Sequence, residues 1–259
     1  MQNLFLRTIS GILLIISVLF FSLKGGLLLL IATIILSLIA STEFHKAMKK
    51  IDINYPIFLQ IAFGIGLNLA SYYKLSYVTY SIIALITISS LMLVALGNKY
   101  RMKDMMGFIF AFLYCNFLMN FFILFDEPYK LFIVYLCSWG SDTFAYLVGM
   151  VFGRHKLIEK LSPNKTIEGS IGGLIAATVL IVIYTNYLGI ENNLYWAIAA
   201  LFMAMFSQVG DLCASYIKRI TGIKDFGNII LGHGGILDRF DSVLFVLPIA
   251  YFISNLIGG

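Results

Sequence analysis

The run GLLLLIATIILSLIAS, residues 26–41, contains no charged residue, and it sets the character of the whole chain. The chain is 60% hydrophobic and 12% charged, whereas a soluble domain has about 25% charged residues. Similar apolar runs recur along the sequence, and several approach or exceed about 18 residues, the length of a helix that crosses a bilayer. We therefore predict an all-α, polytopic integral membrane protein with about nine transmembrane helices. The expected spans are 6–23, 26–41, 56–73, 77–97, 106–125, 130–152, 170–189, 194–217 and 238–257.

Basic residues are distributed unevenly between the two ends of these spans. The connections after the second, fourth, sixth and eighth spans, together with Arg7 and Arg239, carry 15 of the 18 Lys and Arg residues. The opposite connections carry only Lys24, Lys74 and Lys130. This asymmetry follows the positive-inside rule, which places the N-terminus in the cytoplasm and the C-terminus outside. The net charge of +5 therefore reports topology, and we expect no nucleic-acid partner.

The chain shows no internal repeat and no low-complexity tract, so we interpret residues 1–259 as a single membrane domain. Within it, residues 1–125 are expected to form N-terminal helices, and residues 126–259 the C-terminal catalytic helices and cytoplasmic loops. The segment 41–53 has apolar residues at helical spacing and lysines elsewhere on the turn, which predicts a short helix at the membrane interface. No cleavage site of the A-x-A type follows the first apolar run, so we expect that run to remain as the first helix.

The three cysteines, Cys115, Cys137 and Cys213, lie inside apolar runs and show no CxxC spacing. Such cysteines are typical of small buried hydrophobic residues. The sequence therefore supports neither a disulfide framework nor a zinc site.

Two acidic residues fall inside expected spans, where a charge is costly and usually functional. Asp142 lies in the sixth span, and Asp211 lies near the cytoplasmic end of the eighth. Ser207, Asp211, Ser215 and Lys218 are spaced so that they line one helical face. A buried polar network that fixes helix packing is the alternative interpretation of these residues.

Two further acids begin the ninth span, on the same cytoplasmic edge as Asp211. Asp238 and Asp241 stand at positions i and i+3, where a helix N-terminus also stabilises negative charge. Three carboxylates at one membrane depth repel each other unless a cation binds. Oxygen ligands favour a hard cation, and Mg²⁺ usually shares its coordination shell with water and substrate phosphates. We therefore predict that Asp211, Asp238 and Asp241 are catalytic metal ligands.

The stretch KDFGNIILGHGGILDRFDS, residues 224–242, joins the eighth and ninth spans. Its glycines allow backbone N–H groups to approach an anion closely. His233, between two of them, is interpreted either as a general base or as a residue that holds the loop or donates to a phosphate. The loop after the sixth span adds Lys165 beside the hydroxyl of Thr166. Together these features predict a metal-dependent site for a phosphorylated substrate, open to both cytoplasm and bilayer. The basic residues expected there are Lys165, Lys218, Arg219, Lys224 and Arg239.

These residues resemble the signature of the phosphatidate cytidylyltransferase (CDP-diacylglycerol synthase) family. Two upstream motifs also match, from Asp142 to Gly153 and from Ser162 to Gly169, and Leu231 departs from the proline usual in the family before G-H-G-G. The signature positions are Ser215, Lys218, Arg219, Lys224, Asp225, Gly227, His233, Gly234, Gly235, Asp238, Arg239 and Asp241, preceded by Gln208, Gly210, Asp211 and Leu212.

The resemblance implies transfer of CMP from CTP to phosphatidic acid, giving CDP-diacylglycerol and pyrophosphate. It implies Mg²⁺ as cofactor, a second cation site that can take K⁺, and a homodimer in the bilayer. We expect a multi-pass protein of a bacterial inner (plasma) membrane with its active site facing the cytoplasm. Asp211, Asp238, Asp241, Lys218 and His233 would form the catalytic set. The residues expected to bind substrate are Ser215, Arg219, Lys165, Thr166, Glu168, Lys224, Asp225, Gly234, Gly235, Arg239 and Asp142.

Two other functions fit parts of this pattern. A CTP-dependent lipid kinase of the prenol or dolichol type would direct attack at the γ-phosphorus and release CDP. An ion-coupled transporter would use Asp142 and Asp211 as a relay, although transporters often show repeats in both halves of the chain.

Overall fold

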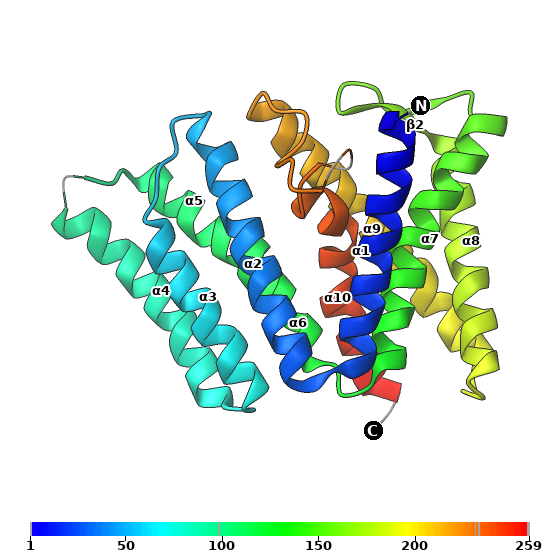
Figure 1. The fold of residues 1–259 in the computed structure, drawn as a ribbon, viewed down its shortest axis with the longest axis horizontal. Coiled ribbons are helices and arrows are strands. Elements are labelled where there is room, and N and C mark those ends of the chain that lie inside the picture. Colours follow the sequence, from blue (N-terminus) through cyan, green and yellow to red (C-terminus); the bar gives the residue numbers. More distant parts are fainter. Residues whose placement is uncertain (1, 98, 231, 233, 258–259) are drawn as a thin grey trace. The chain divides into compact units, whose positions relative to one another are not determined.

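The computed structural model describes residues 2–97, 99–230, 232 and 234–257, and it is helical at each of the nine expected runs (Figure 1). The all-α, polytopic prediction is confirmed, whereas the number of spans and the orientation stay predictions. In the described part of the chain, six helical segments are long and apolar enough to cross a membrane. They are Gly26–Lys49, Ser76–Ala95, Met102–Leu124, Pro128–Phe152, Ile167–Tyr187 and Asn193–Ile220, and Ile9–Lys24 and Ile57–Tyr72 are shorter apolar helices.

The chain divides into two compact units. The first comprises the residues up to Pro128 together with Ile220–Arg239, and the second comprises Tyr129–Arg219 and the residues from Phe240 onward. The first boundary lies close to the expected division at 125/126, but the loop 220–239 groups with the N-terminal helices. Part of the expected catalytic region therefore belongs to the first unit.

The first unit is built from packed helices, among which α2 contacts α3, α5 and α6. Figure 1 shows α2, α3 and α6 running side by side. A π-helical turn, η1, joins α5 to α6 without a break in the helix. The elements are α1 (Gln2–Lys24), α2 (Gly26–Lys49), α3 (Ile57–Tyr72), α4 (Ser76–Leu96), α5 (Met102–Phe112), η1 (Leu113–Phe117) and α6 (Leu118–Leu124).

Helix α2 is longer than the sequence indicated. The segment 41–49 continues α2, and no separate interfacial helix begins at Ser41. Phe44 and Met48, which were expected to face the interface, are buried at 0% and 5% exposure. Their apolar face therefore packs inside the protein, and the helix ends at Lys49, just before the turn that contains Asp52, whose φ is +58°.

A buried cluster of uncharged polar side chains lies around the π-helical turn. Asn116 of η1 donates to Ser37 (2.6 Å) and Ser41 (3.3 Å) of α2 and accepts from Gln60 of α3 (3.0 Å). A Cβ at Gly64 would lie 2.3 Å from the Asn116 amide nitrogen, so only glycine leaves room for it. These hydrogen bonds satisfy polar groups within an apolar segment and fix how α2, α3 and η1 pack.

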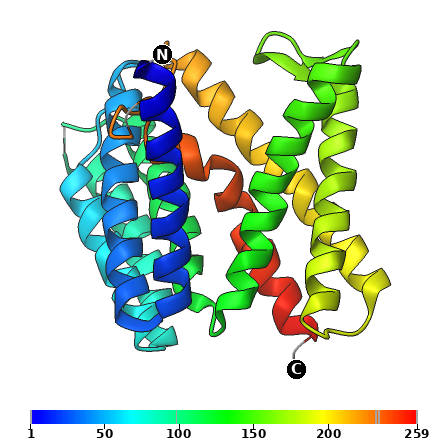
Figure 2. The same ribbon diagram turned by 45° about the vertical axis from the view of Figure 1, so that its right-hand side comes forward.

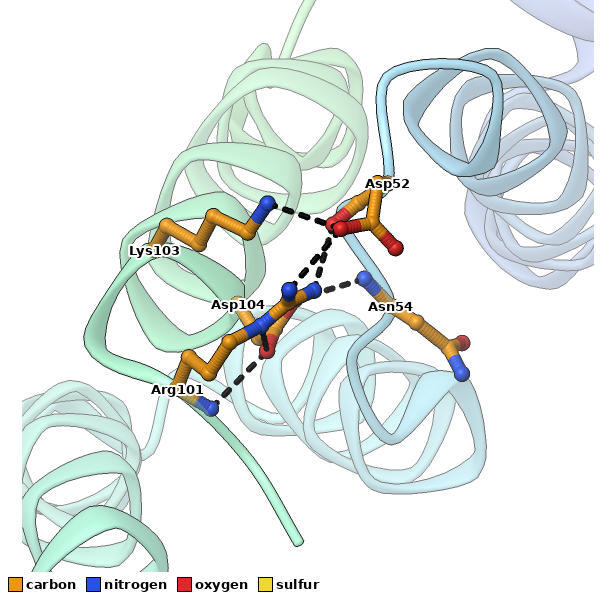
Figure 3. A network of polar contacts seen from close by, with 5 residues as sticks. All are labelled: Asp52, Asn54, Arg101, Lys103 and Asp104. Atoms are coloured by element: carbon orange, nitrogen blue, oxygen red, sulfur yellow. Dashed lines mark hydrogen bonds and ion pairs between the residues drawn. The ribbon is translucent and has the colours of Figure 1, made fainter.

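A second polar network joins the loop after α2 to the start of α5 (Figure 3). Asp104, only 2% exposed, accepts the backbone N–H groups of Arg101 and Asn54, both at 2.8 Å. Arg101 also donates to the carboxylate of Asp52 (2.8 Å), which Lys103 contacts at 3.1 Å. Asp104 thus caps the N-terminus of α5 and holds the neighbouring loop against it.

This network predicts a pH-dependent stability. Hydrogen bonds from Arg101 and then Lys103 lower the pKa of Asp52 to about 2, from an ordinary value of 3.8. A group whose folded-state pKa is depressed stabilises the protein above about pH 4 and loses that contribution as pH falls through about 2. The melting temperature of the wild type should therefore exceed that of Asp52→Asn near neutral pH, and the difference should vanish toward about pH 2.

Melting curves of both proteins across this pH range make the comparison. Asp52 is 77% exposed, so salt at about 1 M should shrink the difference at neutral pH. A difference that stayed constant with pH, or grew in acid, would rule out this role of Asp52.

The second unit contains α7 and α8, which lie side by side in both views, with a small β-hairpin between them (Figure 2). The hairpin pairs two antiparallel strands within a region that the sequence indicated only as a loop. A Cβ at Gly169 would lie 2.5 Å from the carbonyl oxygen of Ala145, so the two helix backbones approach closely there. The elements are α7 (Pro128–Phe152), β1 (Lys156–Ile158), β2 (Ser162–Thr166), α8 (Ile167–Tyr187), α9 (Asn193–Ile220) and α10 (Leu237–Ile257).

Candidate functional site

Two of the predicted metal acids lie on adjoining helices of the second unit. A Cβ at Gly210 of α9 would lie 2.6 Å from the carbonyl oxygen of Asp241 on α10, so the two backbones meet at this point. Asp211 follows Gly210 directly, and it interacts electrostatically with Asp241, as do Asp142 and Lys218. Asp241 is only 7% exposed, and it accepts a hydrogen bond from the backbone N–H of Ser242 (2.8 Å). This unit therefore gathers buried negative charge beside a lysine.

The β-hairpin brings basic residues to the same helices. The ammonium group of Lys165 on β2 forms an ion pair with the carboxylate of Asp211. Arg219, near the end of α9, donates to the carbonyl oxygen of Leu161 in the hairpin (3.2 Å). Residues far apart in sequence thus come together in the second unit, and Lys165 provides positive charge next to Asp211.

Asp142 reaches this region through a chain of hydroxyl groups. Its carboxylate accepts from Ser242 (3.0 Å), the residue that follows Asp241. Ser138 and Ser242 are hydrogen-bonded at 2.7 Å, and Ser207 contacts Ser138 at 3.4 Å. The intramembrane acids were interpreted either as functional residues or as part of a buried polar network. The structure shows a buried polar network next to the candidate site, so the two interpretations do not exclude each other.

Two residues expected to bind substrate have local partners in the structure. The hydroxyl of Thr166 is the N-cap of α8, where it accepts from the N–H of Gly169 (3.1 Å). Glu168 accepts from the backbone N–H groups of Arg154 (3.1 Å) and His155 (3.2 Å) and contacts the His155 ring at 2.6 Å. His155 therefore has a partner that the sequence did not reveal. The first contact caps the helix that follows Lys165, and the second ties the start of that helix to the residues that lead into β1.

The remaining predicted residues lie on the loop of the first unit. The Oδ2 atom of Asp238 accepts from the N–H groups of Phe226 (2.8 Å) and Gly235 (2.9 Å). A carboxylate offers about four lone-pair sites, so these two bonds do not exhaust its capacity as a ligand. Lys224 and Asp225 are exposed and Arg239 is half-buried, whereas Leu231 and His233 lie outside the described residues. Asp238 therefore closes the loop on itself in addition to any role toward a metal ion.

Gly234 has a φ of +87°, a conformation that favours glycine, and its carbonyl oxygen accepts from the N–H of Ile230 (3.0 Å). Gly232 is also left-handed, with a φ of +76°. Both glycines therefore adopt a backbone conformation that other residues rarely reach. Ser215 and Lys218 are half-buried on α9 in the second unit.

One acidic residue of this loop region was missed from the sequence. Glu43 on α2, 3% exposed, accepts from the backbone N–H groups of Ile236 and Leu237, both at 3.0 Å. The only available signal was an acid next to the long apolar run of α2. The lysines near Glu43 led us to interpret the segment as an interfacial helix. A buried position for the Glu43 side chain was therefore not expected.

The donor chemistry fits a hard cation. In neither unit do three or more described His, Cys, Asp or Glu side chains gather closely enough to hold a metal ion by themselves. Magnesium is usually held by one or two carboxylates together with water and substrate phosphates, so a complete protein cage is not required. Asp211 and Asp241, which offer only oxygen atoms, suit that mode of binding.

Comparison with known proteins identifies the family. A sequence model described as the cytidylyltransferase family matches residues 5–257. The chain belongs to the cytidylyltransferase family.

Named relatives agree with this membership. The chain is 34% identical over 257 residues to the phosphatidate cytidylyltransferase of Staphylococcus saprophyticus, covering 94% of this chain and 96% of the relative. It is 35% identical over 249 residues to the enzyme of that name from Staphylococcus aureus strain COL, with the same coverage. The phosphatidate cytidylyltransferase of Bacillus subtilis is 42% identical over 160 residues, which are 59% of this chain and 60% of that protein. The cytidylyltransferase match thus includes both units.

Proposed function

We propose that this protein transfers CMP from CTP to phosphatidic acid and releases CDP-diacylglycerol and pyrophosphate. The observation that carries the proposal is the similarity, across nearly the whole chain, to relatives named phosphatidate cytidylyltransferase. The apolar helices place such an enzyme in a membrane, where its lipid substrate resides. The polar hairpin and loop bring charged groups to the helix ends, where a water-soluble nucleotide can reach them.

The reaction joins two anions. A phosphate oxygen of the lipid attacks the α-phosphorus of CTP, and the bond from that phosphorus to the bridging oxygen of the β-phosphate breaks. Pyrophosphate leaves with the electron pair of that bond. Since the attacking phosphate is already ionised near neutral pH, catalysis depends on charge neutralisation and positioning rather than on a strong base.

The basic residues of the second unit are suited to hold the phosphates. Lys165 pairs with Asp211, and this partner can be exchanged for a phosphate oxygen because both side chains remain partly exposed, at 29% and 23%. Lys218 lies on the same face of α9 as Asp211, seven residues further along the helix. Arg219 is hydrogen-bonded to the hairpin. Arg219 donates through Nε to the hairpin, which orients its guanidinium group.

We further propose that Asp211 and Asp241 of the second unit hold Mg²⁺, and the metal-binding role expected of Asp238 stays a prediction from the sequence. When bound, the ion supplies charge neutralisation at the nucleotide phosphates. Asp241 is held beside Asp211 by the close approach of α9 and α10 at Gly210. The potassium ion and the homodimer implied by the family resemblance stay predictions.

Product analysis tests the proposed function. Purified protein in phosphatidic acid-containing liposomes is incubated with CTP and Mg²⁺, and both the soluble and the lipid products are identified. Pyrophosphate together with CDP-diacylglycerol is the expected pair. Formation of CDP with a newly phosphorylated prenol or lipid would identify a CTP-dependent kinase instead, and ion flux without nucleotide turnover would identify a transporter.

The orientation of the chain gives a separate prediction. Helix α8 has 21 residues and so extends about 30 Å, which matches the hydrocarbon core of a bilayer. The exposed residues Asn164 and Glu191 flank its two ends. With a cytoplasmic N-terminus, a membrane-impermeant thiol reagent should label Glu191→Cys in intact cells, and should label Asn164→Cys only after permeabilisation.

The experiment starts from a variant whose three native cysteines are replaced, and each new cysteine is shown to react in detergent as a control. The reverse labelling pattern would place the hairpin outside the cell and refute a site that uses cytoplasmic CTP.

A further inference from the structure

The backbone amides that lead into α10 are shared between two buried carboxylates. Gly235 donates to Asp238 (2.9 Å), and the next two N–H groups, of Ile236 and Leu237, donate to the two oxygens of Glu43, each at 3.0 Å. The initial N–H groups of a helix have no acceptor within the helix, so they require partners of this kind. Glu43 supplies them from α2, nearly two hundred residues away in sequence, although both segments belong to the first unit.

The loop is shaped around the Glu43 carboxylate. A Cβ at Gly227 would lie 2.2 Å from its Oε1 atom, and a Cβ at Gly235 would lie 2.4 Å from the same atom. No larger residue fits at either position while the carboxylate stays in place. The ring of Phe226, next to Gly227, stacks on the ring of Phe44 with a centroid separation of 6.3 Å. Two consecutive residues of α2 therefore contact the loop at two places, at residues 226–227 and at residues 235–237.

The position of Asp238 depends on this arrangement. Its backbone directly follows the two amides bound by Glu43, and its side chain closes the loop through Phe226 and Gly235. A charge buried at 3% exposure is costly, and an apolar side chain would fill the same volume without that cost. An apolar side chain could not, however, orient the two amides. The geometry thus gives the charged residue a specific task at the start of α10.

We infer that Glu43 is a positioning residue that fixes the first turn of α10 and thereby aims the carboxylate of Asp238 for phosphoryl chemistry. This inference rests on the proposed cytidylyl transfer. Glu43 acts through the backbone of residues 236–238 and makes no contact with the reacting groups. It is additional to the residues expected from the sequence.

The first variant is Glu43→Gln. The amide of Gln offers one oxygen and an NH₂ group, so at most one of the two helix amides keeps its acceptor, and the other is left unpaired or faces a donor. Turnover per folded molecule should fall about 100-fold, because small displacements of a catalytic group have effects of that size. Hydrogen exchange at Ile236 and Leu237 should accelerate, and this is measured without CTP or Mg²⁺.

Asp104→Asn is the matched control. Asp104 is also a buried carboxylate of the first unit that accepts two backbone N–H groups at a helix start, but it serves α5. It should lower the melting temperature, keep wild-type turnover per folded molecule, and leave exchange at 236–237 unchanged. If Glu43→Gln behaves in the same way as Asp104→Asn in turnover and in exchange, the positioning role is refuted.

A second pair of variants covers the case in which Glu43→Gln does not fold. Gly227→Ala should push the carboxylate away and lower turnover while keeping every charge. Glu43→Asp shortens the side chain by one methylene and makes room for the new methyl group. The double variant Glu43→Asp/Gly227→Ala should therefore be more active than Gly227→Ala alone, a coupling expected only between groups in contact. Wild-type turnover and wild-type exchange in Gly227→Ala would overturn the inference.

These outcomes are separable from a failure of the proposed function. If the wild-type protein forms no CDP-diacylglycerol from CTP and phosphatidic acid, the proposed function is wrong, whatever the variants do. If the wild type is active and the Glu43 variants match it in turnover and exchange, only the inference about Glu43 fails.

Discussion

Replacing Asp241 with Asn is expected to reduce turnover by about three orders of magnitude, because a metal ion held by such a carboxylate supplies several kcal/mol of transition-state stabilisation. Asn keeps the size of the side chain and one acceptor oxygen, so the bond from the N–H of Ser242 can persist. Only the negative charge is lost. The melting temperature should not fall, because Asp241 is buried near Asp211 and Asp142 and the repulsion among these acids is relieved.

Turnover and melting temperature are measured together, with and without Mg²⁺. A ligand that binds the folded state raises its stability, so Mg²⁺ should raise the melting temperature of the wild type and have a smaller effect on Asp241→Asn. Asp211→Asn is expected to share this behaviour. Should Asp241→Asn melt early and still turn over normally, the acid would belong to a structural network and not to a metal site.

The apolar runs made the membrane fold predictable, because helices that cross a bilayer must be continuous and apolar. The limits of α2 were less predictable. Glu43 and the lysines around it are polar in sequence, but the helix continues to Lys49 because the face carrying Phe44 and Met48 is buried by tertiary packing. Local composition cannot distinguish a face that packs against protein from one that lies at the interface.

Part of the site was predictable because the expected topology places the segments that carry its residues at the same membrane edge. Asp211 and Lys165 were expected to act together, and their ion pair is present. The contribution of Glu43 depends instead on a contact with residues 236 and 237, which helical periodicity does not encode. The sequence did show two glycines, Gly227 and Gly235. The reason for glycine at these positions is the Glu43 carboxylate, which would clash with a Cβ atom at either one.

Lys165→Met tests the basic half of the site. Lys165 lies on β2 and pairs with Asp211, and both side chains are partly exposed, at 29% and 23%. Ion pairs near the surface contribute about 0–1 kcal/mol to stability, so the melting temperature should change little. The value of kcat/KM for CTP should fall about 10- to 150-fold, since a hydrogen bond to a charged group is worth about 1.5–3 kcal/mol. The loss should thus appear in catalysis and not in folding.

Lys160→Met is the matched control. Lys160 is an exposed lysine of the same hairpin, and this substitution removes the same positive charge. It should retain the kinetics of the wild type. Lys165→Arg should recover part of the activity, because it restores the positive charge with a different donor geometry. If Lys165→Met and Lys160→Met are kinetically equal to the wild type, Lys165 contributes only to membrane topology. If both lose activity equally, the effect arises from the net charge of the hairpin, and the specific pairing with Asp211 has no catalytic consequence.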